Sequence, residues 1–469
     1  MVAKAAISAG IPPAMVTSSS GYISVHSYRL STVVPSSVTG EEVNYELTDA
    51  DLLHKLHYLR AVHVFRAPAP GVAALTIREL KEPMFPWLDL YFPVSGRLRR
   101  REEAADGEVA DKAAAETGRP YVRCNDCGVR IVEATCDATV DEWMEAEAAR
   151  GGQCKVLAYD KVIGPELFFS PLLYVQVTSF KCGGMALGFT WAHLIGDIPC
   201  AATCFTTWAN ILSGKKVVPA PTLRDPLTSP PPPGPLPTGV AAAPPSAVVK
   251  VTAAPVGDHW AVPTTHDMVP FSFHVTEQQL KSLQLQLGAS RHVGTFELVA
   301  ALTWRALAGI RGLDEEDATR TVTVVKTIDD TANGGGRLGL TNEHRIGHVV
   351  ATSPAVTDVA KLAALLAGVS LADAATVAAE AAAMADDVVV YGANLTLVDA
   401  EGVDVYGMEL GPWRPAHVEY AVDGVGDGGA VVVHRDGGGG RGRTVAGVVR
   451  RGEADRLRAA LRDALRVAV

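Results

Sequence analysis

The spacing of apolar residues predicts helices in five places along the chain. Capping pairs precede two of them, Thr48 with Asp51 and Thr276 with Gln279. The first predicted helix carries its leucines on one face as far as Leu59. The other helices are predicted over Ile198–Leu212, from Thr295 to Arg311, and around Leu457–Leu465.

Short runs rich in β-branched residues predict strands in both halves of the chain. These runs are Tyr121–Arg123, Val129–Glu133, Leu172–Phe180, Met185–Trp191, Val322–Lys326, Val388–Val390, Val418–Val422, Ala430–His434 and Thr444–Val449. Asn125-Asp126-Cys127-Gly128 predicts a hairpin turn between the first two strands. Strands and helices that alternate with hairpins favour an α/β fold with mixed sheets.

A segment dense in proline, alanine and threonine, Val217–Pro255, predicts an extended linker of polyproline character. The expected organisation is a disordered tail over 1–27, a domain over 28–215, the linker over 216–265 and a second domain over 266–469. The N-terminus lacks a compact apolar stretch, which argues against a secretory signal. No transmembrane span is expected, because the uncharged stretch 226–249 is broken by prolines.

Composition narrows the classes of function. The chain has 469 residues, of which 42 are Lys or Arg and 52 are Asp or Glu, for a net charge of -10. An acidic protein is not expected to bind nucleic acid. The seven cysteines include one CxxC pair, Cys124 and Cys127, but no second pair follows it. We therefore expect reduced thiols and no metal site.

Three patterns contain residues that could carry chemistry. His54 and His57 stand three apart on the first predicted helix, a spacing at which two histidines can share a metal. No third ligand is apparent, so solvent-facing positions are expected. The glycines at 424–429 match GxGxxG, but a strand follows them, so the pattern predicts a hairpin turn rather than a dinucleotide site. His193 follows a predicted core strand and precedes Asp197 in an HxxxD pattern. A histidine at that position can act as a general base, while Asp197 can cap the next helix.

The sequence Trp191-Ala192-His193-Leu194-Ile195-Gly196-Asp197 resembles the HxxxD motif of the BAHD family of plant acyl-CoA-dependent acyltransferases. Two further stretches, 93–98 and 296–305, share the resemblance. It implies two similar chloramphenicol-acetyltransferase-like α/β domains with mixed sheets, joined by a long crossover loop. It also implies that His193 deprotonates an acceptor that attacks an acyl-CoA co-substrate, with no cofactor bound permanently. Asp197 would orient the loop, and we expect it to pair with Arg305.

Several longer stretches resemble the eceriferum/glossy clade of this family, among them 31–35, 55–62, 121–126, 180–184, 391–396 and 424–427. The family's second motif, DFGWG, falls at 409–413, where only the glycine matches in register. The family's YFGN falls at Arg345-Ile346-Gly347-His348. Because the first motif is kept and the others are altered, the sequence leaves open whether the protein is an enzyme.

The clade resemblance implies a protein that promotes elongation of very-long-chain acyl-CoAs for cuticular wax. It would act on the cytosolic face of the endoplasmic reticulum beside a condensing enzyme, a 3-ketoacyl-CoA synthase, and its fold is expected to be monomeric. Two alternatives stay open at this point. One is an active O- or N-acyltransferase that uses His193 as general base, and the other is a scaffold without a small-molecule site.

Overall fold

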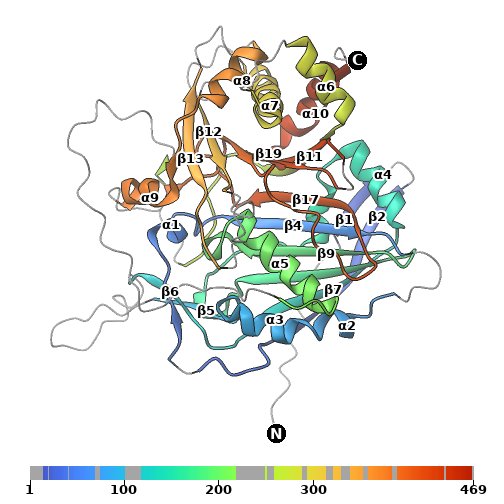
Figure 1. The fold of residues 1–469 in the computed structure, drawn as a ribbon, viewed down its shortest axis with the longest axis vertical. Helices are drawn as coiled ribbons and strands as arrows, with labels where there is room; N and C mark the ends of the chain where they lie inside the picture. Colours follow the sequence, from blue (N-terminus) through green and yellow to red (C-terminus); the bar gives the residue numbers. More distant parts are fainter. Residues whose placement is uncertain are drawn as a thin grey trace, which may run out of the picture.

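The computed structural model describes residues 14–18, 21–40, 42–68, 74–100, 118–217, 249–250, 258–287, 293–312, 321–328, 339–351, 358–382, 388–437 and 440–466. Two seven-stranded sheets lie between two groups of helices (Figure 1). Most of the predicted linker, 216–265, falls outside the described residues. The division into domains at 28–215 and 266–469 stays a prediction.

The first sheet is formed mainly by the N-terminal half and is mixed, because β7 and β8 run parallel while their neighbours are antiparallel. Its strands, in spatial order, are β1 (Ala14–Ser18), β2 (Gly21–Val33), β7 (Val129–Cys136), β8 (Leu173–Phe180), β9 (Met185–Ala192), β4 (Tyr58–Phe65) and β17 (Pro415–Asp423). The last of these comes from the C-terminal half and pairs antiparallel with β4 over its whole length.

The second sheet belongs to the C-terminal half and is also mixed. Its strands, in order, are β11 (Met268–Val275), β19 (Arg443–Arg450), β18 (Ala430–Arg435), β16 (Leu395–Asp399), β12 (Thr321–Lys326), β13 (Arg345–Val350) and β14 (Ala372–Asp373). Two small sheets complete the set, β3 (Asn44–Tyr45) with β6 (Pro120–Arg123) and β5 (Arg97–Arg100), and β10 (Val249–Lys250) with β15 (Val388–Val389). The predicted α/β fold with mixed sheets is confirmed.

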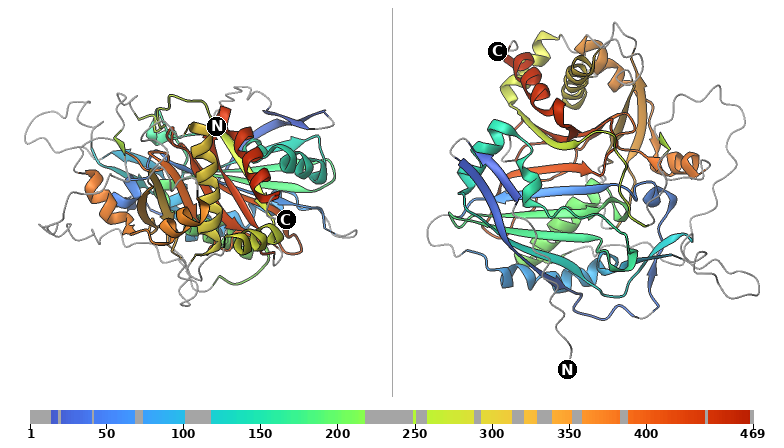
Figure 2. Two further views of the ribbon diagram at one scale, coloured as in Figure 1. Left: turned by 90° about the horizontal axis from the view of Figure 1, so that it is seen from above. Right: turned by 180° about the vertical axis from the view of Figure 1, so that it is seen from behind.

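Helices cover the outer face of each sheet, and the views from above and behind agree on this (Figure 2). Beside the first sheet lie α2 (Ile77–Lys81), α3 (Met84–Leu90), α4 (Val140–Arg150) and α5 (Ile198–Leu212). Over the second lie α6 (Glu277–Gln286), α7 (Thr295–Arg311), α8 (Val359–Ala367) and α10 (Arg451–Arg466), while α1 (Asp49–Leu52) contacts α9 (Ala374–Ala382) between the two halves. The predicted starts of α5, α6 and α7 are confirmed.

Three local expectations differ from the structure. Residues 14–18 form a strand that pairs with Gly21–Val25, inside the segment 1–27 that is expected to be a disordered tail. The strands on either side of 125–128 do not form a hairpin, because β6 pairs with β5 whereas β7 pairs with β2 and β8. The first helix ends at Leu52 rather than Leu59, because Tyr58–Phe65 is drawn into pairing with both β9 and β17.

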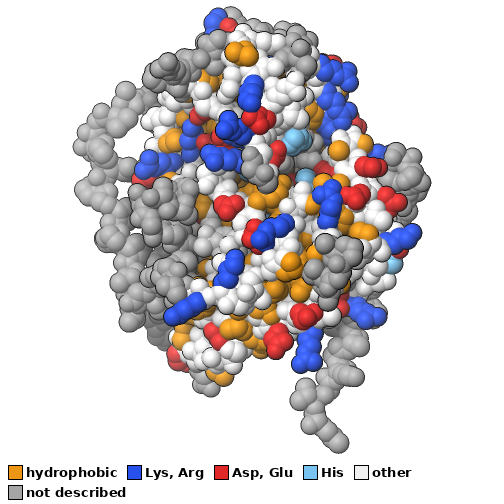
Figure 3. Space-filling view, turned by 45° about the vertical axis from the view of Figure 1, so that its right-hand side comes forward, with side chains coloured by type: hydrophobic (Ala, Val, Ile, Leu, Met, Phe, Trp, Pro, Cys, Tyr) orange, Lys and Arg blue, Asp and Glu red, His pale blue; other side chains and the backbone are white. Residues whose placement is uncertain are grey.

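The surface mixes charges of both signs with apolar side chains. On the face shown in Figure 3, acidic and basic groups are interspersed around an apolar band. The described side chains on this face do not form the single large basic patch that nucleic-acid binding requires. None of the described helices is long and apolar enough to cross a bilayer.

Candidate functional site

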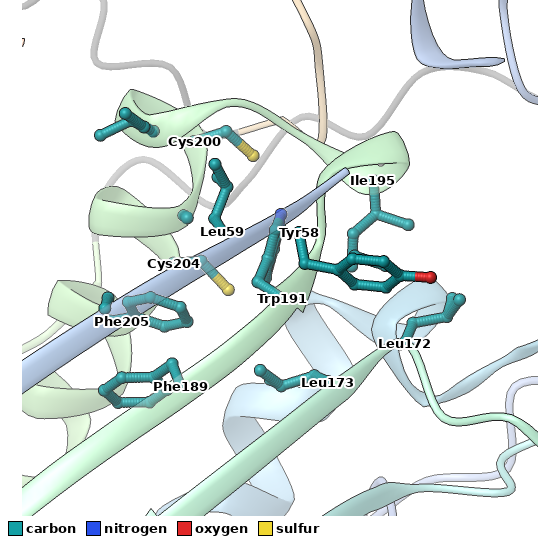
Figure 4. Close-up of a cluster of buried hydrophobic side chains, with 14 of the residues drawn as sticks. Tyr58, Leu59, Leu172, Leu173, Phe189, Trp191, Ile195, Cys200, Cys204 and Phe205 are labelled. Atoms are coloured by element: carbon teal, nitrogen blue, oxygen red, sulfur yellow. The ribbon is translucent and has the colours of Figure 1, made fainter. Parts of the chain in front are cut away.

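His193 lies where strand β9 ends and a short 3-10 helix, η5 (His193–Ile195), begins. Its backbone N–H donates to the carbonyl of His57 at 3.0 Å. The indole N–H of Trp191 donates to the carbonyl of Gly196 at 2.9 Å. This hydrogen bond joins the end of β9 to the residue that follows η5. Trp191, Phe189 and Phe205 belong to a buried apolar cluster between β9 and α5 (Figure 4), so the position of His193 rests on a rigid core.

The His193 side chain is sealed from solvent, with 1% of the residue exposed. Its Nε2 lies 3.0 Å from the hydroxyl of Tyr391. Burial is the largest cause that lowers the pKa of His193 to about 3, and the nearby rings of His344 and His57 lower it further. The ring is therefore neutral at physiological pH. Whichever partner donates the hydrogen bond, the phenol occupies the place where an acceptor substrate would meet the base.

His54 and His57 are buried beside His193, which contradicts the expectation that they face solvent. The helix α1 stops before them, and the chain turns inward to enter β4. The His54 ring stacks on the His193 ring at a centroid distance of 4.5 Å. In the part of the chain that the structure describes, neither ring nitrogen of His54 has a hydrogen-bond partner. Burial, followed by the other three histidines, holds its pKa well below the usual range.

His57 ties together three segments that are distant in sequence. Its Nδ1–H donates to the carbonyl of Gly424 at 2.7 Å, which leaves Nε2 as an acceptor. That nitrogen accepts from the backbone N–H groups of Val390 at 3.2 Å and Tyr391 at 3.4 Å. Burial lowers the pKa of His57 to about 4, against the opposing hydrogen bond to Gly424. This histidine therefore acts as a structural link rather than a metal ligand.

The glycine-rich segment 424–429 positions Tyr391 over His193. The N–H of Gly426 donates to the carbonyl of Tyr391 at 3.0 Å, and that of Gly428 donates to Gly392 at 2.8 Å. A Cβ added at Gly392, where φ is +86°, would meet the nitrogen of Gly426 at 2.4 Å, so the close approach requires glycine. The segment is a turn, as predicted, but it joins strands of different sheets instead of a hairpin, because β17 pairs with β4 and β18 pairs with β16 and β19.

Asp197 caps α5 and holds a segment of the C-terminal half. Its carboxylate accepts from the N–H of Cys200 at 3.2 Å, which caps α5, and from the N–H of Glu343 at 3.2 Å. His344 Nδ1 lies 3.7 Å from the same carboxylate. Among the described residues, no ion pair joins Asp197 to Arg305, so that expected pairing is wrong. Arg305 lies on α7, which packs against α8 and α10 in the outer helix layer.

Asn342 reinforces the same contact between the halves. Its amide donates to the carboxylate of Asp51 at 3.1 Å and to the carbonyl of His193 at 3.1 Å. The N–H of Asp197 donates to the carbonyl of Thr341 at 3.0 Å. Sequence reasoning missed Asn342, for which the sequence carries no local signal. It also missed the role of Tyr391, although that residue opens one of the clade-like stretches.

The stretch that replaces DFGWG lies away from His193 and is a packing element. Leu410 and Trp413 close a tight turn through reciprocal backbone hydrogen bonds. Trp413 is buried in the core of the first sheet. The N–H of Gly411 donates to the hydroxyl of Ser213 at 2.8 Å, just after α5. The altered motif therefore still anchors the C-terminal half against α5.

Comparison with known proteins places the chain among acyltransferase relatives. The profile described as the Transferase family matches residues 23–363. Protein ECERIFERUM 2 of Arabidopsis thaliana is 35% identical over 87% of this chain and 91% of its own length. Protein ECERIFERUM 26-like of the same plant is 36% identical over 87% and 89%. A hydroxycinnamoyltransferase of Narcissus pseudonarcissus is 27% identical over 58% of each chain.

Solved structures show the same fold at low sequence identity. Vinorine synthase matches with a TM-score of 0.63 and 16% identity, covering 94% of this chain and 98% of its own. TRI101 of F. graminearum complexed with ethyl coenzyme A matches with a TM-score of 0.64 and 13% identity, covering 89% and 97%. At these identities the likeness shows the fold alone.

Proposed function

The chain belongs to the BAHD acyltransferase family, and from that premise we propose that it promotes elongation of very-long-chain acyl-CoAs for cuticular wax without using His193 as a base. The observation that carries the proposal is the sealed histidine: 1% exposed, with Nε2 held by the Tyr391 hydroxyl. The similarity to the ECERIFERUM proteins over most of the chain supports a role in the same process.

The chemistry of the site supports an accessory role over acyl transfer. A general base must lie within hydrogen-bond reach of the proton that it removes. Here His193, His54 and Tyr391 pack ring against ring, with centroids 4.5 Å and 5.3 Å from His193. An acceptor could reach Nε2 only if Tyr391 moved, and the backbone of Tyr391 is held by His57 and Gly426.

The proposed partner is a 3-ketoacyl-CoA synthase at the cytosolic face of the endoplasmic reticulum. Elongation needs a condensing enzyme, and the residue at the family's catalytic position here, His193, is sealed from solvent among the described residues. Its contribution would then be to bind the condensing enzyme or to help hold the acyl chain. In this proposal acyl-CoA is the substrate of the elongase, and the chain itself binds no cofactor permanently.

A second candidate is an active O- or N-acyltransferase that uses His193. The intact HxxxD turn favours it, because His193 and Asp197 keep the strand-end and helix-cap positions that the family chemistry needs. This candidate requires Tyr391 to leave Nε2 when substrate binds. It predicts release of free CoA from acyl-CoA and an acceptor by the purified protein, and loss of that release in His193→Ala.

Co-expression tests the proposal. The protein would be expressed with a condensing enzyme in a host that makes no very-long-chain wax precursors, and the acyl-CoA chain lengths would be profiled. We expect longer acyl-CoAs only when both proteins are present, together with co-purification of the pair. An unchanged profile, or lengthening without the condensing enzyme, would contradict the proposal.

A further inference from the structure

A second cluster of reactive side chains lies far from His193, where strand β17 begins beside α4 (Figure 1). Cys154 comes from a short 3-10 helix, η3 (Gln153–Leu157), and His417 and Glu419 come from β17. The two strand residues are two apart, so their side chains leave the same face of the sheet. We propose that Cys154, His417 and Glu419 bind a zinc ion or a similar borderline-soft divalent cation. The proposal is independent of the proposed function.

The geometry of the donors matches a tetrahedral zinc site. Cys154 Sγ lies 3.6 Å from His417 Nε2. Sulfur at about 2.3 Å and nitrogen at about 2.1 Å from a tetrahedral zinc lie about 3.6 Å from each other. One donor atom from each of the three residues lies within 4.8 Å of the other two.

The state of Glu419 is the independent observation that points to a ligand. The residue is 1% exposed, and within the described part of the chain neither carboxylate oxygen has a hydrogen-bond partner. A buried carboxylate without hydrogen bonds is costly, and a coordinated cation would offset that cost. Arg60, which interacts electrostatically with Glu419, binds both oxygens of Asp423 through Nη1, at 2.7 Å and 2.9 Å, and makes no hydrogen bond to Glu419 among the described residues.

Neighbouring groups define the site. Glu147 is adjacent, but its oxygens accept from the N–H groups of Gly152 at 2.8 Å and Gln153 at 2.6 Å, so it serves as a surrounding charge and not as a ligand. Thiolate and imidazole suit zinc better than calcium or magnesium, which prefer sites built from oxygen alone. The donor set therefore selects a zinc-like ion.

Of the three donor residues, His417 borders a cavity. The cavity measures about 650 Å³ and is also lined by His274, Tyr406 and Arg458, while Cys154 and Glu419 lie behind its lining. Three protein ligands with a fourth position near a cavity is the arrangement of zinc sites that exchange a water or ligand, whereas structural sites use four protein ligands. In the proposed site, a cation would enter past His417.

Zinc binding to the full-length protein tests the proposal. Protein freed of metal by chelation would be dialysed against zinc and, separately, against cobalt, whose thiolate charge-transfer band reports a cysteine ligand. We expect one tightly bound zinc per chain and a thiolate band in the cobalt form. Cys154→Ser and His417→Gln should each weaken zinc binding by about tenfold or more.

Matched variants control for general effects. Cys136→Ser changes another buried cysteine, and His274→Gln changes another histidine of the same cavity, so both should bind zinc as the wild type does. If Cys154→Ser fails to fold, Glu419→Gln supplies the third ligand test. Absence of bound zinc, equal binding by wild type and His417→Gln, or loss of binding in His274→Gln instead would each overturn the proposal.

Discussion

The antiparallel pair β4–β17 carries a buried, histidine-containing cluster near each end, and the two clusters differ in the groups that surround the histidine. Near Tyr58, His193 lies among three other histidines and Tyr391, sealed from solvent. Near Val64, about 20 Å along the strand, His417 lies with a thiol and a carboxylate and borders a cavity. The histidine of the HxxxD motif is covered by other rings, whereas the cluster that this motif does not mark combines three kinds of metal donor.

The buried imidazoles and the buried carboxyl Glu419 are expected to respond to pH in opposite directions. Burial of His193, His57 and, at the other end, His417 disfavours their protonated form, so at acidic pH each binds fewer protons in the folded state than in the unfolded chain. Burial of Glu419 favours its protonated form, and the pKa of this carboxyl is raised to about 8. Glu419 is therefore the group that distinguishes the pH response of its cluster.

Acidification should lower the free energy of unfolding through the buried histidines around His193, and this is the largest effect that we expect. With pKa values of about 3 for His193 and about 4 for His57, against about 6.5 in the unfolded chain, the stability contributed by each neutral ring is complete above pH 6.5 and is lost as pH falls. At pH 5 each ring should cost about 2 kcal/mol. Urea unfolding at a series of pH values measures this. His57→Gln should reduce the slope below pH 6.5, and an unchanged slope would contradict the account.

Asp197→Ala should lower the free energy of unfolding by about 2–4 kcal/mol, since it removes a helix cap and leaves the N–H of Glu343 without its acceptor. Urea denaturation at pH 7 measures the change. Asp197→Asn is the matched control, because asparagine caps helices nearly as well and should lose less. Equal losses in the two variants would show that the negative charge, not the hydrogen bonds, carries the stabilisation.

Glu419→Gln should stabilise the metal-free protein at pH 7 or above by on the order of 2 kcal/mol. The raised pKa means that folding takes up a proton between about pH 4.5 and 8, so stability conferred by the protonated acid is lost as pH rises through that range. The Glu419→Gln variant has no carboxyl group at this position and therefore takes up no proton there on folding. Thermal melting in the presence of a chelator, compared at pH 5 and pH 8, checks the sign. A variant that is less stable than wild type at pH 8 would refute this assignment.

Tyr391→Phe should cost only about 1 kcal/mol, the loss of one buried hydrogen bond to His193. The phenyl ring would still cover His193, so the variant should release no CoA from acyl-CoA. Tyr58→Phe, which removes the two hydrogen bonds of another buried phenol, is a control for stability and should cost more. Acyl transfer that appears in Tyr391→Phe alone would mean that the hydroxyl by itself blocks the base.

Much of the fold could be predicted from the sequence, because the signals for these helices and strands lie within short segments. The stripe from Ile198 and the cap at Thr276 predicted α5 and α6, and the apolar runs around 172–191 predicted β8 and β9. Prediction failed where long-range pairing overrode local spacing. The leucine face that suggested a helix as far as Leu59 instead leads into β4, and this change buries His54 and His57.

The sites were less predictable for the same reason. The HxxxD pattern located His193 and Asp197, but Tyr391 reaches His193 across 198 positions of sequence. Cys154 and His417 are 263 positions apart and share no motif, so the expectation of no metal site weighed only the CxxC pair and the pair His54 and His57. His417 meets Cys154 because β17 pairs with β4, which contacts the 3-10 helix that carries Cys154.

Elongation is proposed not to need a base at His193. The most direct measurement is the acyl-CoA profile of His193→Ala co-expressed with the condensing enzyme, with its fold checked by thermal melting. A general base contributes roughly 10²–10⁴-fold to a rate. We expect the variant to lengthen acyl chains to within about twofold of wild type, a far smaller change than the loss of a general base would cause. Complete loss of elongation by a folded His193→Ala protein would contradict the proposal and favour the acyltransferase candidate.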